Sequence, residues 1–376
     1  MILKGLNRNN ELIEIEIKGN IISRVTWLPK EEITGKEHYI IPGFIDIHTH
    51  GGYGTDFVDK SEKSIRKYLR NLPQEGTTSI VQATITTDKE TLESCLKIAK
   101  HVQDNQNKNE SRYLGVNIEG NYLNPFKKGA HKKEYLTPLT TSQVDFLTQF
   151  NNVRIISHAI ELSTLKTTQY MVNKGVIPSI AHTVATGDIV LKHIKNGLKG
   201  VTHTFNAMTQ FNHREDNAIN RALTENKLYT EIIVDGLHVH PANVKLLYKI
   251  KPLDKIMIIT DSAPPKGMPD GDYKFGELDI YKEGNTIKTK LDDVFAGSIA
   301  TMHQCFKNMI KFTGCSLKSA SIMSSTNQAE YLGIKNLGDI KKGYLADILI
   351  LDKKLEIVKT IVNGKTLYSR GLKWTK

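Results

Sequence analysis

Two histidines, His48 and His50, stand one residue apart at the end of a short apolar stretch, within FIDIHTHGGYG (44–54). Side chains two residues apart in a strand point to the same face, so both imidazoles would point at one place. The glycines that follow allow the backbone to turn sharply away. Convergent imidazoles are ligands that a divalent metal ion prefers, although a His-x-His pair alone also fits a structural role.

Ionisable residues also follow other short apolar stretches of the chain. They are Glu119, His182, His203, Asp235, His238 and Asp261. The ends of buried strands are usually apolar, and burying so many ionisable groups without partners would cost on the order of several kcal/mol per group. A bound cation would remove this difficulty, so the pattern predicts a metal site.

These apolar stretches belong to a series of eight predicted strands. The strands cover residues 44–48, 78–86, 113–120, 153–161, 176–183, 200–208, 230–238 and 255–263. Segments between them have helical periodicity, for example 61–76 and 91–102. Eight strands alternating with helices indicate an α/β fold, a (β/α)8 TIM-like barrel, in which chemistry belongs at the C-terminal ends of the strands.

Both ends of the chain follow a different pattern. Residues 11–27 and 346–368 alternate apolar with polar side chains, around a Gly-Asn pair in the first range and an Asn-Gly pair in the second. Such alternation around a turn predicts antiparallel hairpins. We therefore predict a small β-sandwich domain built from both termini, residues 1–42 and 339–376, and a barrel catalytic domain of residues 43–338.

The charge of the chain does not point to nucleic acid. The 376 residues carry a net charge of +11, but only nine of the 51 basic residues are arginines and the lysines are scattered. A nucleic-acid-binding protein usually gathers its basic residues in a patch or a tail. We expect no nucleic-acid partner, although the surplus charge would help to attract an anionic small molecule.

The sequence also argues against a membrane or secreted protein. No apolar run approaches the roughly 18 residues of a membrane span, and the N-terminal residues lack the features of a signal peptide. The three cysteines, Cys95, Cys305 and Cys315, have neither metal-type nor redox-type spacing. Such a sparse, odd set fits a reducing compartment, so we expect a cytoplasmic protein.

Several segments together resemble a known family. They are PGFIDIHTHGGYG (42–54), NIEGNYLNPFKKGAH (117–131), AHTVATG (181–187), THTFNAMTQFNHRE (202–215), VDGLHVHP (234–241), ITDS (259–262), KGMPDGDY (266–273) and FAGSIATM (295–302). The histidine pair, the later single histidines and the final aspartate resemble the amidohydrolase superfamily. The local motifs resemble its N-acetylglucosamine-6-phosphate deacetylase family over nearly the whole chain.

The resemblance implies a divalent metal, either one or two ions of Zn, Fe, Co or Mn per subunit. Glu119, His182 and His203 would form one site, and His48 and His50 could hold a second ion with Glu119 as a bridge. Asp261 matches the catalytic acid/base, which takes a proton from the attacking water and passes it to the departing nitrogen. The alternative is that Asp261 is only another ligand.

The resemblance also implies how the sugar is bound. Arg214 would pair with the phosphate from the neighbouring subunit of a homodimer, because a guanidinium matches two phosphate oxygens. His131 would lie over the sugar, or else be a surface histidine, and His213 and His240 would be loop and packing residues. The remaining predicted contacts to the substrate are Ala130, Asn206, Ala207, Asp235, Gly236, Leu237, His238, Phe295, Ala296 and Gly297.

The implied activity is hydrolysis of N-acetyl-D-glucosamine 6-phosphate to D-glucosamine 6-phosphate and acetate, in amino-sugar catabolism and cell-wall sugar recycling. Departures from the family pattern near the sugar leave the galactosamine epimer open as a substrate. They are Asn121, Tyr122, Ala181, Asp216, Asn217, Pro264 and Pro265. Two further alternatives are another amide hydrolase or deaminase of the superfamily and a catalytically inactive assembly protein on the same scaffold.

Overall fold

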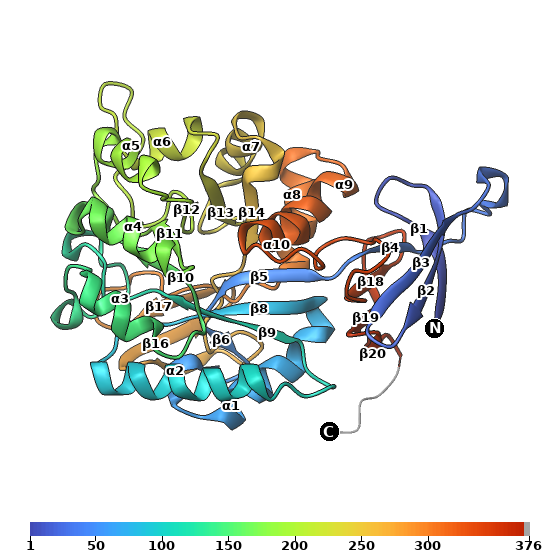
Figure 1. The fold of residues 1–376 in the computed structure, drawn as a ribbon, viewed down its shortest axis with the longest axis horizontal. Coiled ribbons are helices and arrows are strands. Elements are labelled where there is room, and N and C mark those ends of the chain that lie inside the picture. Colours follow the sequence, from blue (N-terminus) through green and yellow to red (C-terminus); the bar gives the residue numbers. More distant parts are fainter. Residues whose placement is uncertain (372–376) are drawn as a thin grey trace.

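The computed structural model describes residues 1–371 of the chain. A large α/β body lies beside a smaller sheet, and the smaller sheet contains the first and the last strands of the described chain (Figure 1). The last five residues of the predicted small domain, 372–376, lie outside the described residues.

The α/β body is built on eight strands that pair in parallel, in the order β14-β13-β12-β11-β10-β9-β8-β5. They are β5 (Phe44–Thr49), β8 (Thr77–Ala83), β9 (Arg112–Ile118), β10 (Val153–His158), β11 (Ile177–Ile180), β12 (Gly200–Val201), β13 (Tyr229–Ile233) and β14 (Ile256–Ile259). The ring closes where Thr49 bridges Ser262 and the Asp261 amide donates to the His48 carbonyl at 2.9 Å. The predicted TIM-like barrel is confirmed.

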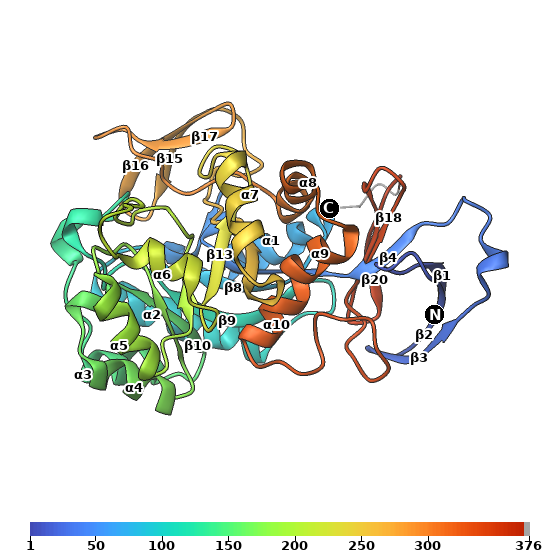
Figure 2. The same ribbon diagram turned by 90° about the horizontal axis from the view of Figure 1, so that it is seen from above.

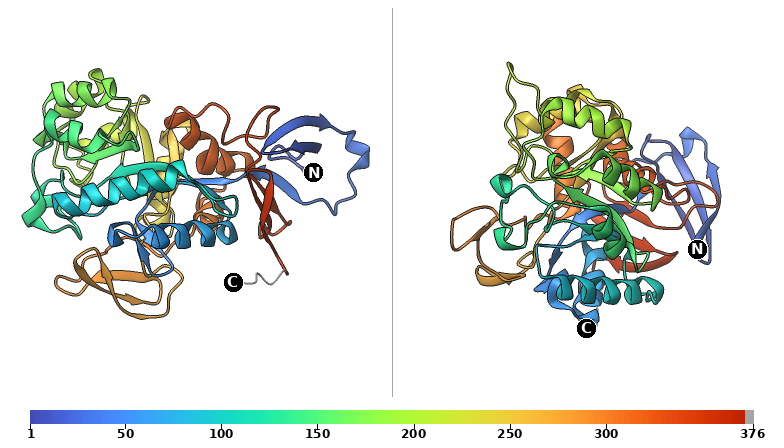
Figure 3. Two further views of the ribbon diagram at one scale, coloured as in Figure 1. Left: turned by 60° about the horizontal axis from the view of Figure 1, so that its bottom comes forward. Right: turned by 60° about the vertical axis from the view of Figure 1, so that its left-hand side comes forward.

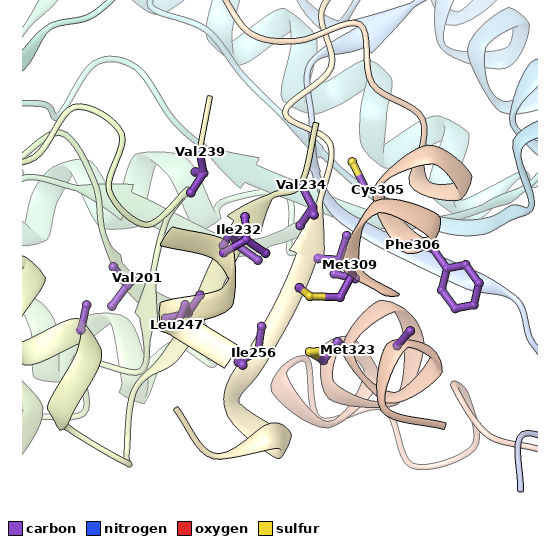
Figure 4. Close-up of a cluster of buried hydrophobic side chains, with 14 of the residues drawn as sticks. Val201, Ile232, Val234, Val239, Leu247, Ile256, Cys305, Phe306, Met309 and Met323 are labelled. Atoms are coloured by element: carbon purple, nitrogen blue, oxygen red, sulfur yellow. The ribbon is translucent and has the colours of Figure 1, made fainter. Parts of the chain in front are cut away.

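Helices cover the outside of the barrel strands. They are α1 (Glu62–Asn71), α2 (Lys89–Asp104), α3 (Thr141–Thr148), α4 (Leu165–Asn173), α5 (Gly187–Lys195), α6 (Ala218–Thr224), α7 (Pro241–Ile250), α8 (Met302–Thr313), α9 (Leu317–Ser321) and α10 (Asn327–Tyr331). Hydroxyl or carboxylate side chains cap many of them at the N-terminus, as Asp88 does for α2. In one apolar cluster between strands and helices, Ile232 of β13 and Ile256 of β14 lie with Met309 of α8 (Figure 4).

The two ends of the chain form one seven-stranded sheet, in the order β20-β19-β18-β4-β1-β2-β3. Its strands are β1 (Ile2–Leu6), β2 (Leu12–Lys18), β3 (Ile21–Trp27), β4 (Tyr39–Pro42), β18 (Ile348–Leu351), β19 (Ile357–Val362) and β20 (Lys365–Ser369). Ile15 of β2 and Ile361 of β19, from opposite ends of the sheet, share one buried cluster. The sheet therefore curves around a core of its own, and both predicted hairpins are present.

All seven strands fall within the ranges predicted for the small domain, although the exact domain boundaries stay a prediction. Within residues 1–371, no helix combines the length and the apolar character needed to cross a bilayer.

A three-stranded antiparallel sheet between β14 and α8 was not predicted. It consists of β15 (Gly271–Phe275), β16 (Leu278–Glu283) and β17 (Thr286–Thr289), and a smaller pair, β6 (Gly51–Gly52) and β7 (Thr55–Asp56), lies in the loop after β5. The three-stranded sheet projects from the barrel on the side away from the small domain (Figures 2 and 3). Phe275, Ile280 and Ile287 pack against Ile85 and Ala263 of the barrel loops, which places this insertion beside the C-terminal ends of the barrel strands.

A buried carboxylate joins the barrel to the small sheet. Asp347 accepts from the Arg112 guanidinium of β9 at 3.2 Å and from the Asn363 amide of the β19–β20 turn at 2.7 Å. Its backbone carbonyl accepts from the Gly43 amide between β4 and β5 at 2.9 Å. Asp347 therefore bonds simultaneously to groups of both parts of the chain.

Replacing Asp347 by alanine should lower the free energy of unfolding by about 1–3 kcal/mol, because Arg112 and the Asn363 amide lose a buried acceptor. Urea unfolding of the wild type and the variant measures this change. Asp279→Ala, whose ion pair with Lys274 is exposed, is the matched control and should change it by less than about 0.5 kcal/mol. Equal losses in both variants would contradict the role given to Asp347.

Candidate active site

Six ionisable side chains meet at the C-terminal end of the barrel. They are His48 and His50 of the β5 strand and its end, Glu119 after β9, His182 after β11, His203 after β12 and Asp261 after β14. All six are buried. Three of them, His182, His203 and Asp261, have positive φ angles of 44°, 29° and 52°, a conformation that is uncommon outside glycine. Such backbone strain gathers at functional sites, where the surrounding structure enforces it.

The Glu119 carboxylate lies between two pairs of imidazoles. Its Oε2 atom is 3.1 Å from His48 Nε2 and 3.2 Å from His50 Nε2. Its Oε1 atom is 2.9 Å from His203 Nε2 and 3.6 Å from His182 Nε2. Each oxygen therefore faces a separate pair of ligand atoms, which is the arrangement expected of a carboxylate shared between two metal ions.

Asp261 completes the first of these two groups. Its Oδ1 atom lies 3.0 Å from His50 Nε2 and 3.6 Å from His48 Nε2. The ligand atoms of His48, His50, Glu119 and Asp261 all lie within 4.8 Å of one another, as do those of Glu119, His182 and His203. The cluster thus offers three or four donors to each of two ions, and mixed imidazole and carboxylate donors suit Zn, Fe, Co or Mn.

Neighbouring groups fix which ring nitrogen of two histidines is free to bind a metal. His182 Nδ1 donates to the Lys127 carbonyl at 2.6 Å, and His48 Nδ1 donates to Glu231 Oε2 at 3.0 Å. A carbonyl and a carboxylate can only accept, so Nδ1 carries a proton in each ring, and Nε2, the atom that faces Glu119, is the nitrogen left for a metal ion. Both rings are therefore held in an orientation that suits binding of a cation.

The surroundings of the two carboxylates in the cluster favour their charged forms. Burial disfavours the Glu119 carboxylate, but the charge on His48 and the hydrogen bonds from His182 and His203 lower its pKa well below the usual range. Burial likewise acts against Asp261, yet the hydrogen bond from His50 lowers its pKa to about 2. Both carboxylates are therefore anionic at neutral pH. Metal ions and protons compete for the same imidazole nitrogens in such a site.

A cavity of about 480 Å³ opens above the cluster. His50, Glu119, His182, His203 and Asp261 contribute to its polar part. The other lining residues are Ile85, Pro125, Phe126, Lys127, Lys128, Gly129, Ala130, His131, Asn206, Ala207, His238, Phe275, Asp292, Val294, Phe295 and Gly297. Ile85 and the β15 residue Phe275 supply an apolar wall, so the unpredicted insertion forms part of the pocket.

Seven of the residues predicted to contact the substrate line this cavity: Ala130, His131, Asn206, Ala207, His238, Phe295 and Gly297. His131 is not a surface histidine. It is buried, its ring lies edge-on to that of His182, and Thr86 Oγ1 is 2.5 Å from its Nδ1 atom. Burial and the charge of His182 lower the pKa of His131 well below the usual value, which leaves its ring neutral.

The remaining predicted residues lie outside the lining. Asp235 lies behind the lining residue His238 and accepts from its Nδ1 atom at 2.6 Å, Leu237 is half-exposed, and Ala296 packs under the insertion. Gly236 also lies outside the lining. The deeply buried His48 lies beneath the lining.

Arg214 is exposed and does not reach the cavity of its own chain. Its Nε atom donates to His213 Nε2 at 3.2 Å, and both residues lie in the loop before α6. His240, by contrast, caps α7 by accepting from the Ala242 amide. One chain therefore forms the metal cluster and most of the pocket without Arg214.

Two buried carboxylates that support the cluster were missed in the sequence. Asp46 of β5 accepts from Thr260 Oγ1 at 2.5 Å, and Glu231 of β13 contacts His48. Both are single acidic residues inside apolar strands, FIDIH and TEIIV. An acid in such a position was the available signal, because a buried strand rarely accepts a carboxylate without a partner.

Replacing both His48 and His50 by glutamine should lower the metal content towards one equivalent per chain. Glu119, His182 and His203 keep their own set of donors, so the other site should stay filled. Elemental analysis of metal-replete protein measures this, with His213→Gln as the control that removes a histidine outside the cluster. An unchanged metal content in the double variant would mean that the pair is structural.

Comparison with known proteins agrees with the geometry. The family model "Amidohydrolase family" matches residues 39–367. An N-acetylglucosamine-6-phosphate deacetylase of Bacillus subtilis (strain 168) is 32% identical over 93% of this chain and 91% of its own. An N-acetylgalactosamine-6-phosphate deacetylase of Escherichia coli O157:H7 is 29% identical over 94% of each chain.

Solved structures of the same kind superpose closely. N-acetylglucosamine-6-phosphate deacetylase from Thermotoga maritima has a TM-score of 0.89 and 28% identity, covering 98% of this chain and 100% of its own. A mutant of the Mycobacterium smegmatis enzyme, in complex with N-acetyl-D-glucosamine-6-phosphate, has a TM-score of 0.88 and 27% identity over 95% of each chain. From the extent of the family match and of these similarities, the chain belongs to the amidohydrolase family.

Proposed function

We propose that this protein is a metal-dependent deacetylase that hydrolyses N-acetyl-D-glucosamine 6-phosphate to D-glucosamine 6-phosphate and acetate. The observation that carries the proposal is the Glu119-centred cluster at the base of a cavity that also contains His131, Asn206 and His238. The family is metal-dependent, and relatives that cover nearly the whole chain bear the name of this activity.

A metal ion held by Glu119 and the histidines around it would supply Lewis acidity, which activates water at neutral pH and polarises the acetyl carbonyl. Asp261 acts as the base that accepts a proton from the attacking water, since its carboxylate lies in the ionisable cluster and lines the cavity. It then returns the proton to the departing sugar nitrogen. Its Oδ1 atom, 3.0 Å from His50, lies at the base of the cavity, where both transfers take place.

His131 and His238 orient the sugar from two sides of the cavity. The neutral ring of His131 keeps a hydrogen-bonding edge beside the metal cluster without adding positive charge there. His238 is held by Asp235, and its Nε2 atom is buried without a hydrogen-bond partner among residues 1–371. This free nitrogen, together with the lining residues Asn206 and Ala207, is available to the substrate.

We propose a homodimer in which Arg214 of one subunit binds the phosphate in the site of the other. Arg214 is exposed and absent from the lining of its own cavity, although it follows the lining residues Asn206 and Ala207 closely in the chain. Three apolar side chains are highly exposed, Phe211 in the loop of Arg214 and Phe126 and Leu291 in loops that carry lining residues. Their exposed fractions are 60%, 89% and 94%, respectively. Exposed apolar groups around a polar opening are typical of a surface that another chain covers.

The metal and the location of the protein are further parts of the proposal. The donor set suits Zn, Fe, Co or Mn, with one or two ions per subunit. Cys95, Cys305 and Cys315 are all free and buried, which fits a reducing cytoplasm.

The galactosamine epimer is the second candidate substrate, because one of the similar relatives bears that name. Acetate release by metal-loaded protein from each phosphorylated acetylhexosamine tests both. Absence of acetate release from both sugars would overturn the proposed function.

Asp261→Asn should reduce turnover by about 10²–10⁴-fold while leaving folding and metal content nearly unchanged, because one group serves both proton transfers. Acetate release under saturating substrate, with parallel metal analysis, measures this. The control is Asp279→Asn, which removes an exposed carboxylate outside the cavity. Retention of more than a tenth of the wild-type rate would contradict an acid/base role for Asp261.

Arg214→Ala should weaken use of the phosphorylated sugar by about 1.5–3 kcal/mol, the range for a hydrogen bond to a charged group, mainly in kcat/KM. Lysine should rescue the loss only in part, since a point charge cannot reproduce two parallel contacts. The unphosphorylated sugar should be affected little. Equal losses on the two sugars would show that Arg214 does not recognise the phosphate.

Mixing the Arg214→Ala and Asp261→Asn proteins should restore some activity if the arginine crosses between subunits. In a heterodimer, the site with an intact Asp261 would then receive an intact Arg214 from its neighbour. No recovery, with subunit exchange verified, would contradict the proposal that Arg214 acts in the site of the neighbouring subunit.

A further inference from the structure

Glu231 is a deeply buried acidic residue beside the ionisable cluster. It lies in the middle of β13, within the run Tyr-Thr-Glu-Ile-Ile (229–233), and is 1% exposed. It does not line the cavity, so it has no access to the substrate. Its role must therefore be sought in the residues that it contacts.

One oxygen of Glu231 contacts two candidate metal ligands from different strands. Oε2 accepts from His48 Nδ1 at 3.0 Å and from the backbone amide of His203 at 3.2 Å. Its backbone carbonyl accepts from the Thr204 amide at 2.8 Å. Glu231 thus holds the ring of His48 from behind and fixes the backbone of His203, whose φ angle of 29° is strained.

Glu231 differs from other buried glutamates in the charge that balances it. Glu110 pairs with Arg66 and Arg70, and Glu75 pairs with Lys266 at 3.1 Å. Within residues 1–371, Glu231 has no ion pair with a lysine or arginine, and its Oε1 atom is buried without a partner. A buried carboxylate without a cation is costly, so its compensation must come through the imidazole of His48.

We infer that Glu231 is a positioning residue that holds His48 and His203 for metal binding, and that the buried charge of Glu231 is balanced by the metal ion beyond the His48 ring. This inference rests on the metal centre of the proposed function. A carboxylate behind a metal-binding imidazole orients the ring and makes it a stronger ligand. Here a single carboxylate acts on one ligand from each half of the cluster, the side chain of His48 and the backbone of His203.

The test is metal affinity of Glu231→Gln, measured by competition with a chromophoric chelator using Zn²⁺ alone. Glutamine keeps one oxygen that can accept both hydrogen bonds, removes the charge and places an NH2 group at the position of the unpartnered Oε1. We expect affinity about 10- to 100-fold weaker than in the wild type, the usual effect of removing such a supporting carboxylate. The absorption bands of the Co²⁺-loaded protein should also shift, because they report the ligand geometry.

The matched control is Glu110→Gln, which removes the charge of an equally buried glutamate whose partners are arginines. This control should lower the thermal midpoint equally with and without metal and leave Zn²⁺ affinity unchanged. Glu231→Gln should show a smaller rise of the midpoint on adding Zn²⁺ than the wild type does, because its metal binding is weaker.

Zn²⁺ affinity of Glu231→Gln within twofold of the wild type would overturn the inference, as would equal loss of midpoint in the metal-free and loaded forms. Glu231→Asp keeps the charge but shortens the side chain by one methylene, and its Zn²⁺ affinity is measured in parallel. If the glutamine variant does not fold, the aspartate variant tests the inference. It too should bind Zn²⁺ more weakly.

The readouts separate this inference from the proposed function. Weakened Zn²⁺ binding by the variant, in a protein that releases no acetate from either sugar, would support the positioning role and reject the deacetylase. Normal acetate release by the wild type, with unchanged Zn²⁺ affinity in the variant, would support the deacetylase and reject the positioning role of Glu231.

Discussion

The burial of one carboxylate, Glu119, among four imidazoles is the constraint on which the catalytic end of the barrel depends. A carboxylate there is stable only with positive charge nearby, and its two oxygens divide the histidines into two pairs. Each histidine comes from a strand end, so the strands must keep their register for the pairs to form. The closure of the barrel between β5 and β14, where the Asp261 amide bonds to the His48 carbonyl, is therefore also what brings the Asp261 carboxylate beside the histidines.

The alternation of side chains along β5 serves both the cluster and the packing around it. His48 and His50 contact Glu119, while Thr49 between them bonds to Tyr68 at 2.5 Å and to Ser262 at 2.8 Å. Tyr68 in turn accepts from the buried Lys266. The same hydroxyls thus tie the His-x-His segment to the loop after β14, away from the metal. Residues with positive φ angles, such as Asp261, follow the barrel strands. Such strained backbone persists only where surrounding contacts like these hydrogen bonds hold it in place.

Periodicity and strand ends predicted the barrel, the small sheet and the convergence of His48, His50, Glu119, His182, His203 and Asp261, because each depends on local pattern and on the rule that parallel strands end at one face. The insertion β15–β17 was missed, since most of its residues in β15 are exposed and give little apolar alternation. The acid of Glu231 inside an apolar strand was a local signal, but its partner, His48, is distant in sequence, so the contact itself could not be predicted. The place of Arg214 was not derivable from one chain, because its predicted partner belongs to another molecule.

The departures from the family pattern support the loops of the sugar pocket from outside it. Asn121 donates to the Thr87 carbonyl at 2.7 Å, and Tyr122 is buried in the cluster beneath α2 and α3. Pro264 accepts from the Gly54 amide, and Asn217 caps α6. None of the four lines the cavity among the described residues. They can alter the choice between sugar epimers only by moving the backbone that carries the lining, and a shift of the segment 125–131 would move His131 with it. These four departures therefore bear on the position of the loops, whereas the ionisable cluster is positioned by the strand ends.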